Sequence, residues 1–205
     1  MSDSNLHERI LEAAGSRLRS TGLRGINVSR VAAEAGVSRP TVYRHVGGAT
    51  DIVRELIARE LARYFDAVSP VMDAPEPIGE RFVEALRFTV TFARENAVLQ
   101  SLLAEESATV LPLLTLEARP ILERAVELLT PHLVRARQSG EIDITDLPAA
   151  AEWAARMTLS LVLTPPLTST VDSEERLRGF VAELLRRTHQ STNGGAIAAT
   201  DGGRP

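Results

Sequence analysis

Apolar residues recur at intervals of three and four positions along most of this chain. The first run is Leu6, Ile10, Ala14 and Leu18, and comparable runs follow into the last third of the sequence. This spacing places apolar side chains on one face of an α-helix. Strands are indicated by alternating Val, Ile and Thr segments bounded by hairpin dipeptides, and the sequence contains none. We therefore expect an all-α protein.

The composition narrows the class of protein further. With 205 residues and no Cys, the chain can bury a core without cross-links, and it has neither disulfides nor thiolate metal sites. It contains no run of the roughly 20 apolar residues that cross a bilayer. Its N-terminus is polar and acidic, unlike a signal peptide. We expect a cytoplasmic protein with no membrane partner.

Two short helices joined by a glycine turn follow the first helix. Ser29 is expected to cap a helix over 30–35, with Gly36 directly behind it. Ser38 is expected to cap a third helix that holds Pro40 in its first turn. This order is the helix-turn-helix pattern, whose second helix enters the DNA major groove.

The pattern divides the chain into an N-terminal three-helix helix-turn-helix DNA-binding domain and a C-terminal helical domain. We expect the first over residues 1–48, a connecting helix over about 50–69, and the second over 70–190. Residues 191–205 are mostly Gly, Ala, Ser and Thr. This composition is too weakly apolar to order itself, so we expect a disordered tail.

Caps and prolines delimit the helices of the C-terminal part. Residues 73–79 are expected to form a loop, and Asp146 and Ser173 to cap two later helices. Pro131 allows the helix expected over 121–138 to kink or split.

The third helix has one apolar side. Val42 and Val46 lie four residues apart and define the side that faces the core. Arg44 then points almost directly away, about 160–200° from them at 3.6 residues per turn. Thr41 and Tyr43 lie on the two flanks. The helix therefore presents a cation, a hydroxyl and a phenol to its surroundings.

These exposed groups suit DNA. Arg44 can bond guanine O6 and N7, and Thr41 a phosphate or a thymine methyl. Tyr43 and His45 can donate to phosphate oxygens. Residues 1–66 carry ten Arg and eight acidic residues, although the whole chain has a net charge of −4. The predicted DNA-binding residues are Ser29, Arg30, Ser38, Arg39, Pro40, Thr41, Tyr43, Arg44 and His45.

Three of these residues have simpler interpretations. Tyr43 can be a half-buried packing residue, Arg39 a solvated surface charge, and His45 a cation at the end of its helix. A helix-turn-helix pattern alone also occurs in many helical proteins.

Residues 8–60 resemble the DNA-binding domain of the TetR family of bacterial transcriptional repressors. The matching run is ILEAAGSRLRSTGLRGINVSRVAAEAGVSRPTVYRHV, and the remainder is similar to that family's C-terminal domain in the order and length of its helices. The resemblance implies a homodimer that binds a palindromic double-stranded DNA operator. It also implies a small-molecule effector in the C-terminal domain. One position departs: Ala49 stands where the family usually has a phosphate-binding Lys, so that contact is not expected here.

The C-terminal domain supplies candidates for both implied sites. The expected effector-pocket residues are Phe88, Phe92, Trp153, Arg156 and Met157. The expected dimer-interface residues are Leu161, Leu177, Val181, Leu184 and Leu185. The alternatives are that the aromatic residues are ordinary core, that Arg156 forms a surface or interface salt bridge, and that the last two helices pack only within one chain.

No arrangement in the sequence indicates catalysis. The four His residues are scattered without ligand spacing, and there is neither a phosphate loop nor a G-x-S-x-G motif. We expect no metal, no cofactor and no enzymatic activity. The predicted function is a DNA-binding transcriptional regulator, a repressor, under effector control. The alternatives are an all-α enzyme and a helical small-molecule-binding or interaction protein with weakened DNA binding.

Overall fold

The computed structural model describes residues 3–22, 26–105, 107–164, 175–179 and 181. These residues form helices and no strand, which confirms the expected all-α class for the described part. The helices are α1 (Asp3–Thr21), α2 (Val28–Ala35), α3 (Arg39–His45), α4 (Ala49–Met72), α5 (Ile78–Glu95), α6 (Ala97–Glu105), α7 (Ser107–Leu114), α8 (Arg119–Gln138) and α9 (Leu147–Leu163). Residues 175–179 and 181 are also helical.

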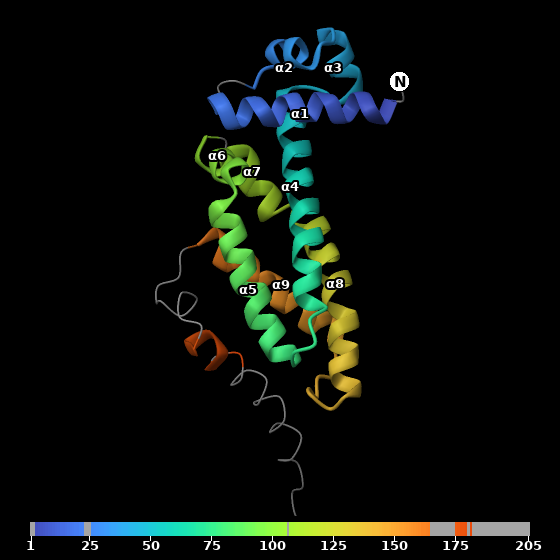
Figure 1. Cartoon of the computed structure of the whole chain (residues 1–205), viewed down its shortest axis with the longest axis vertical. Coiled ribbons are helices and arrows are strands. Elements are labelled where there is room, and N and C mark those ends of the chain that lie inside the picture. The colour runs from blue at the N-terminus through green and yellow to red at the C-terminus, as the bar shows by residue number, and fades with distance from the viewer. Residues whose placement is uncertain (1–2, 23–25, 106, 165–174, 180, 182–205) are drawn as a thin grey trace, which may run out of the picture.

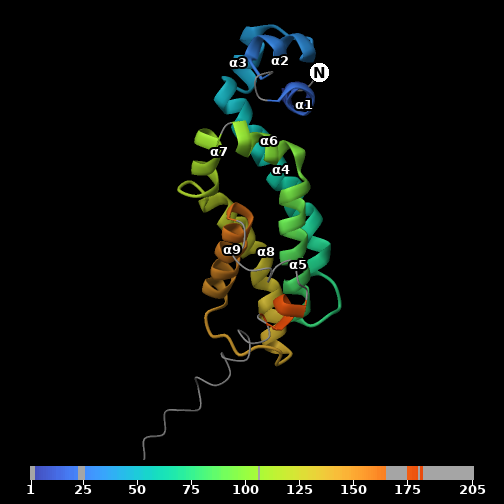
Figure 2. The same ribbon diagram turned by 90° about the vertical axis from the view of Figure 1, so that its left-hand side faces the viewer.

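The molecule is elongated, with a small head at one end. Helices α1, α2 and α3 form this head, and α1 lies across the top of α4 (Figure 1). Helices α4, α5, α8 and α9 run side by side away from it, and α6 and α7 lie between the head and these helices (Figure 2). Helix α4 therefore connects the head to the body, which we define as α5–α9.

Local chemistry explains where the helices of the head begin and end. The cap of α2 is Asn27, whose Oδ1 accepts the Arg30 N–H at 2.9 Å, so the expected cap at Ser29 is wrong. Gly36 ends α2 in the left-handed conformation with φ of 65°, as expected. Ser38 caps α3 through a 3.3 Å bond from Thr41 N–H to its Oγ, also as expected.

Two helices continue through a proline. Helix α4 includes Pro70 and ends three residues beyond the expected boundary, because Met72 is buried and only the last turn loses a hydrogen bond. Helix α8 contains Pro131 and remains a single helix over its 20 residues. Pro131 is exposed, so the carbonyl that lacks its N–H partner lies on the outer side of the helix.

Two loops fix the ends of body helices. Glu141, in the loop after α8, accepts the Ile78 N–H at 2.7 Å and so caps α5 from outside. This bond, with a second from Ser139 Oγ, lowers the pKa of the Glu141 carboxyl. Asp146 caps α9 through the Ala149 N–H at 3.0 Å, as expected.

The hydrophobic core joins the head to the body. One cluster combines buried residues of α1–α4 with Val98 and Leu102 of α6 and Val110 and Leu114 of α7. A second cluster fills the space between α4, α5, α8 and α9. Because α6 and α7 share a core with the head, a movement of these helices must repack the head itself.

No single helix in the described ranges is long and apolar enough to cross a membrane, and α6 and α7 meet that test only as a pair bent by 114°.

Candidate DNA-binding face and effector cavity

Helix α3 is held by its apolar side and open on the other. Val42 is fully buried and Val46 packs partly against the same core cluster. The phenol ring of Tyr43 is 53% exposed, and Arg44 is exposed beside it. Ser38 Oγ and Thr41 Oγ1 lie 2.7 Å apart, so part of the hydrogen-bonding capacity of Thr41 is used within the helix.

The cations around α3 are available for a polyanion. Ser29, Arg30, Ser38, Arg39 and Pro40 are exposed, and Thr41 and His45 are half-buried. Within the described ranges, neither Arg30 nor Arg39 pairs with a carboxylate. Arg44 Nη2 lies 3.5 Å from the Nε2 of His45. The nine expected DNA-binding residues lie on α3, at its cap Ser38 or in the first turn of α2.

Helix α1 braces the two helices above it. His7 Nδ1 lies 3.0 Å from the His45 carbonyl and donates to it, which satisfies the end of α3. Arg9 donates to the Ala35 carbonyl at 2.7 Å and satisfies the end of α2. Arg17 pairs with Glu34 at 2.9 Å. These bonds hold the turn between α2 and α3 against one rigid support.

The start of α4 differs from a phosphate-binding helix end. Ala49 is exposed, and the charged group in the first turn is Asp51, whose Oδ2 accepts the Gly48 N–H at 2.8 Å. No cation of that turn takes the place of the missing Lys.

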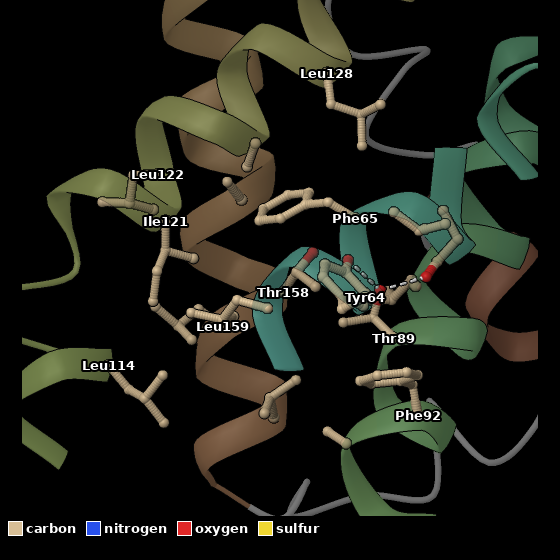
Figure 3. A pocket seen from close by; sticks show the side chains of 18 of the residues that line it. Tyr64, Phe65, Thr89, Phe92, Leu114, Ile121, Leu122, Leu128, Thr158 and Leu159 are labelled. Atoms are coloured by element: carbon tan, nitrogen blue, oxygen red, sulfur yellow. Dashed lines mark hydrogen bonds between the residues drawn. The ribbon is translucent and has the colours of Figure 1, made fainter. Parts of the chain in front are cut away.

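A cavity of about 130 Å³ lies in the body, directly below the head core. It is lined by side chains from α4, α5, α6, α7, α8 and α9 (Figure 3). Most are aliphatic or aromatic, including Ile57, Leu61, Phe65, Phe92, Leu102, Leu114, Leu128 and Leu159. The polar side chains in the lining are those of Glu60, Tyr64, Thr89 and Thr158.

The centre of the cavity holds one hydroxyl pair. Tyr64 Oη and Thr89 Oγ1 lie 2.8 Å apart, and Figure 3 shows both side chains between the rings of Phe65 and Phe92. Burial raises the pKa of the Tyr64 phenol. Tyr64 also contacts Phe65, Phe88 and Phe92 with ring centroids 5.1, 6.4 and 5.5 Å apart. The phenol is therefore neutral and held in one orientation.

The structure supports one of the five expected pocket residues directly. Phe92 lines the cavity, and Phe88 stacks behind it at 6.0 Å. Trp153, Arg156 and Met157 lie on the outer face of α9, and Trp153 is 68% exposed. The reason is helical phase, because α9 turns Ala155, Thr158, Leu159 and Val162 toward the cavity. Arg156 pairs with Glu152 at 2.6 Å, the surface salt bridge that was its alternative.

Sequence reasoning missed the polar residues of the cavity. None of Glu60, Tyr64 and Thr89 is among the residues expected from the sequence to form the pocket. A tyrosine and a threonine on the buried faces of two different helices were the available signal.

The expected dimer residues lie mostly inside one chain. Leu177 and Val181 are buried against Val83 and Leu86 of α5, and Leu161 packs partly on the same cluster. Leu184 and Leu185 lie outside the described residues. The exposed apolar residues of α9 are Trp153 and Met157, which are 68% and 38% exposed. This outer face of α9 is the better candidate for contact with another chain.

A second buried polar cluster joins the ends of α4, α5 and α8. Arg81 and His132 are 8% and 4% exposed, and their Nη1 and Nδ1 atoms lie 3.3 Å apart. Arg81 also donates to the Met72 carbonyl at 2.8 Å, and Arg135 Nη2 lies 2.7 Å from His132 Nδ1. Burial lowers the pKa of His132, Arg135 and Arg81 lower it further, and Asp73 opposes them.

A helix-turn-helix head, joined by α4 to a helical body with an apolar cavity, defines a ligand-responsive DNA-binding regulator. The family model of tetR-type bacterial regulatory proteins matches residues 10–56, and that of the bacterial tetracyclin repressor C-terminal domain matches residues 79–187. The chain belongs to the TetR family of transcriptional regulators.

Individual relatives agree with this assignment. The chain is 29% identical over 167 residues to the HTH-type transcriptional regulator AlkX of Mycobacterium tuberculosis, covering 78% of this chain and 76% of that protein. The TetR-family repressor AlkX of Dietzia sp. strain DQ12-45-1b, implicated in biodegradation of n-alkanes, has a similar structure. Its TM-score is 0.65 at 20% identity, covering 89% of this chain and 95% of that one. A TetR-family regulator from Pectobacterium atrosepticum gives a TM-score of 0.67 at 16% identity, covering 89% and 91%.

Proposed function

We propose that this regulator is a repressor that binds a palindromic operator as a homodimer, with α3 of each subunit in the major groove. The observation that carries the proposal is the anchoring of α3 by buried Val42, which leaves Tyr43 and Arg44 exposed on the opposite side. The proposed DNA contacts are made by the nine separate residues that the sequence analysis lists, of which Ser29 is the first and His45 the last. In a dimer of this kind the two helices lie about 34–36 Å apart, one turn of DNA.

Successive segments of the chain have different proposed roles. Residues 1–48 bind DNA, α4 connects, and residues 70–190 hold the effector and dimerise. A regulator of bacterial DNA works in the cytoplasm, where that DNA lies.

For the dimer we propose a two-fold contact through the outer face of α9. Trp153 and Met157 supply a large exposed apolar surface there, and helix pairs related by a two-fold axis form four-helix interfaces. This replaces the interface expected from Leu177 and Val181, which are already covered by α5.

The shared core supports a route from effector to DNA. Leu102 and Leu114 line the cavity and are also buried in the cluster that includes α1–α4. A ligand that fills the cavity displaces these side chains, and α6 and α7 then shift against the head. We propose that this changes the separation of the two α3 helices and releases the operator, with a coupling free energy of about 1–3 kcal/mol.

The apolar lining favours a hydrophobic effector. The Dietzia relative is implicated in n-alkane biodegradation. By analogy, we propose that the effector of this chain is a hydrophobic carbon compound of the kind that such metabolism handles.

A gel-shift titration tests the repressor proposal. The probe is a duplex from the DNA beside the gene, and the competitor is a shuffled duplex of equal length. We expect a specific shift whose affinity falls steeply with salt, because phosphate contacts release counterions. Equal affinity for both duplexes at every salt concentration would contradict it.

One observation favours a second function. The first turn of α4 carries Asp51 and no cation, which weakens phosphate binding relative to the family pattern. A helical ligand-binding or interaction protein with weakened DNA binding would then show ligand binding and dimerisation with no specific shift in the same titration.

A further inference from the structure

Among the residues that the structure describes, none of those lining the cavity is a cation. Its polar side chains are Glu60, Tyr64, Thr89 and Thr158, and the remaining lining residues are apolar. The nearby cations are already paired: Arg63 with Glu60 at 2.7 Å, and Arg124, whose Cζ lies 6.0 Å from the Phe65 ring centroid, with Glu127. A carboxylate in this cavity would be a buried charge without a partner, which is strongly unfavourable.

The hydroxyl protons of the side chains in the lining already form hydrogen bonds within the protein. Thr89 donates to the Ala85 carbonyl at 2.6 Å, and Thr158 donates to the Ala154 carbonyl at 2.9 Å. A carbonyl only accepts and a hydroxyl has one proton, so Thr89 has none left for Tyr64. Tyr64 is therefore the donor in its 2.8 Å bond with Thr89 (Figure 3).

What remains on these side chains is acceptor capacity. The Tyr64, Thr89 and Thr158 oxygens keep unused lone pairs. Glu60 accepts only, from Arg63 at Oε1 and from Asn96 at Oε2, at 2.7 and 2.8 Å. A ligand that offers a proton finds partners in this lining, whereas one that offers only oxygen lone pairs finds none.

We infer that the cavity takes an uncharged hydrophobic alcohol whose hydroxyl donates to Tyr64 Oη, the phenol oxygen of the Tyr64–Thr89 pair. This rests on the proposed effector role of the cavity and names the chemical class of that effector. A ketone or ester has no proton to give, and it binds only if Tyr64 turns away from Thr89. A protonated amine brings a charge that Glu60 does not balance, because Arg63 already neutralises it.

The cavity volume sets the size of the probe. A protein cavity of roughly 150 Å³ takes a benzene molecule, and the cavity here is about 130 Å³. The probes chosen share one flexible eight-carbon chain, so that they differ only in the polar group that they present to the cavity.

Calorimetric titration of the full chain, without DNA, tests the inference. The probes are 1-octanol, octan-2-one, octanoate and octylamine at pH 7. We expect 1-octanol to bind at least about tenfold more tightly than the ketone, because the ketone oxygen is buried without a hydrogen-bond donor. The two charged probes should bind more weakly still. Equal binding of the ketone or of octanoate overturns the inference, and so does the absence of binding by all four.

Two variants should change the selectivity for alcohol over ketone, one by removing an acceptor and the other by freeing a donor. Tyr64→Phe removes the accepting oxygen, so the affinity for 1-octanol should fall about tenfold while that for the ketone stays. Thr89→Val removes the partner of the phenol proton, so Tyr64 can donate to the ligand and the affinity for the ketone should rise. Tyr43→Phe, the same deletion at the other Tyr of the chain, should leave the selectivity as it is.

These readouts separate the inference from the proposed repressor function. An unchanged alcohol-to-ketone ratio in both Tyr64→Phe and Thr89→Val refutes the alcohol assignment even if the operator is bound. Failure of the gel shift refutes the repressor even if the selectivity is as expected.

Discussion

Leu102 is the side chain through which the proposed coupling is most directly tested. It is fully buried, lines the cavity and belongs to the core shared with the head. Leu102→Ala removes three carbons at a site without solvent access, which typically lowers the free energy of unfolding by about 2–5 kcal/mol. Leu102→Met conserves volume and should lower it by less than about 1.5 kcal/mol.

The coupling gives Leu102→Ala a second effect. The enlarged cavity should still bind a hydrophobic ligand. The ligand should, however, displace the core shared with the head less than it does in the parent. The effector concentration that releases half of the operator should therefore rise. Urea unfolding followed by circular dichroism, at one protein concentration, gives the stability, and anisotropy of a labelled operator duplex gives the release.

Leu116→Ala is the matched control, because Leu116 is 91% exposed. It should change stability by no more than about 0.5 kcal/mol. Normal release in a Leu102→Ala protein that still binds ligand and operator would refute the coupling route through α6.

Three further predictions concern the head, the dimer and pH. Asn27→Ala should destabilise the head by about 0.5–2 kcal/mol, because Asn27 is the cap of α2. Ser29→Ala should destabilise it by less, and thermal unfolding compares the stabilities of the two variants. Trp153→Ala should weaken the dimer by about 2 kcal/mol or more, because aromatic side chains near the centre of an interface carry much of its binding energy. Sedimentation equilibrium measures the monomer–dimer constant, and an unchanged constant would exclude the α9 face. His132 has a folded pKa below its usual value of 6.5, so the unfolded chain takes up the proton first. The stability contributed by neutral His132 should be complete above pH 6.5 and lost as the pH falls through the lower folded pKa. In pH-dependent urea unfolding His132→Gln should flatten this decline, and an equally steep decline in the variant would assign it to other groups.

Local features were predicted from the sequence because their chemistry is local. Ser38, Gly36 and Asp146 delimit helices as expected, since each cap is decided within four residues. Ser29 failed as a cap because Asn27, two residues earlier, is an equally good acceptor. The sequence alone does not decide between two capping residues that lie so close together.

The cavity was harder to predict because it depends on helix rotation. Helix α9 has apolar residues on two sides, one with Trp153 and Met157 and one with Ala155 and Leu159. Large aromatic size favoured the first side, yet the smaller side chains face inward and leave the space that becomes the cavity. The pairing of Tyr64 with Thr89 joins two helices across 25 positions, and no periodicity in either helix indicates it.

The claim that α3 reads DNA is tested most directly by anisotropy titration of a labelled operator duplex. The proteins compared are the parent, Arg44→Ala, and Arg87→Ala, which removes an Arg paired with Glu84 on α5. We expect Arg44→Ala to lose about 1–3 kcal/mol of binding to the specific duplex and little to a shuffled one. Arg87→Ala should match the parent, and all three should keep their helical spectrum and dimer mass. Parent-like binding of the specific duplex by Arg44→Ala would contradict the account.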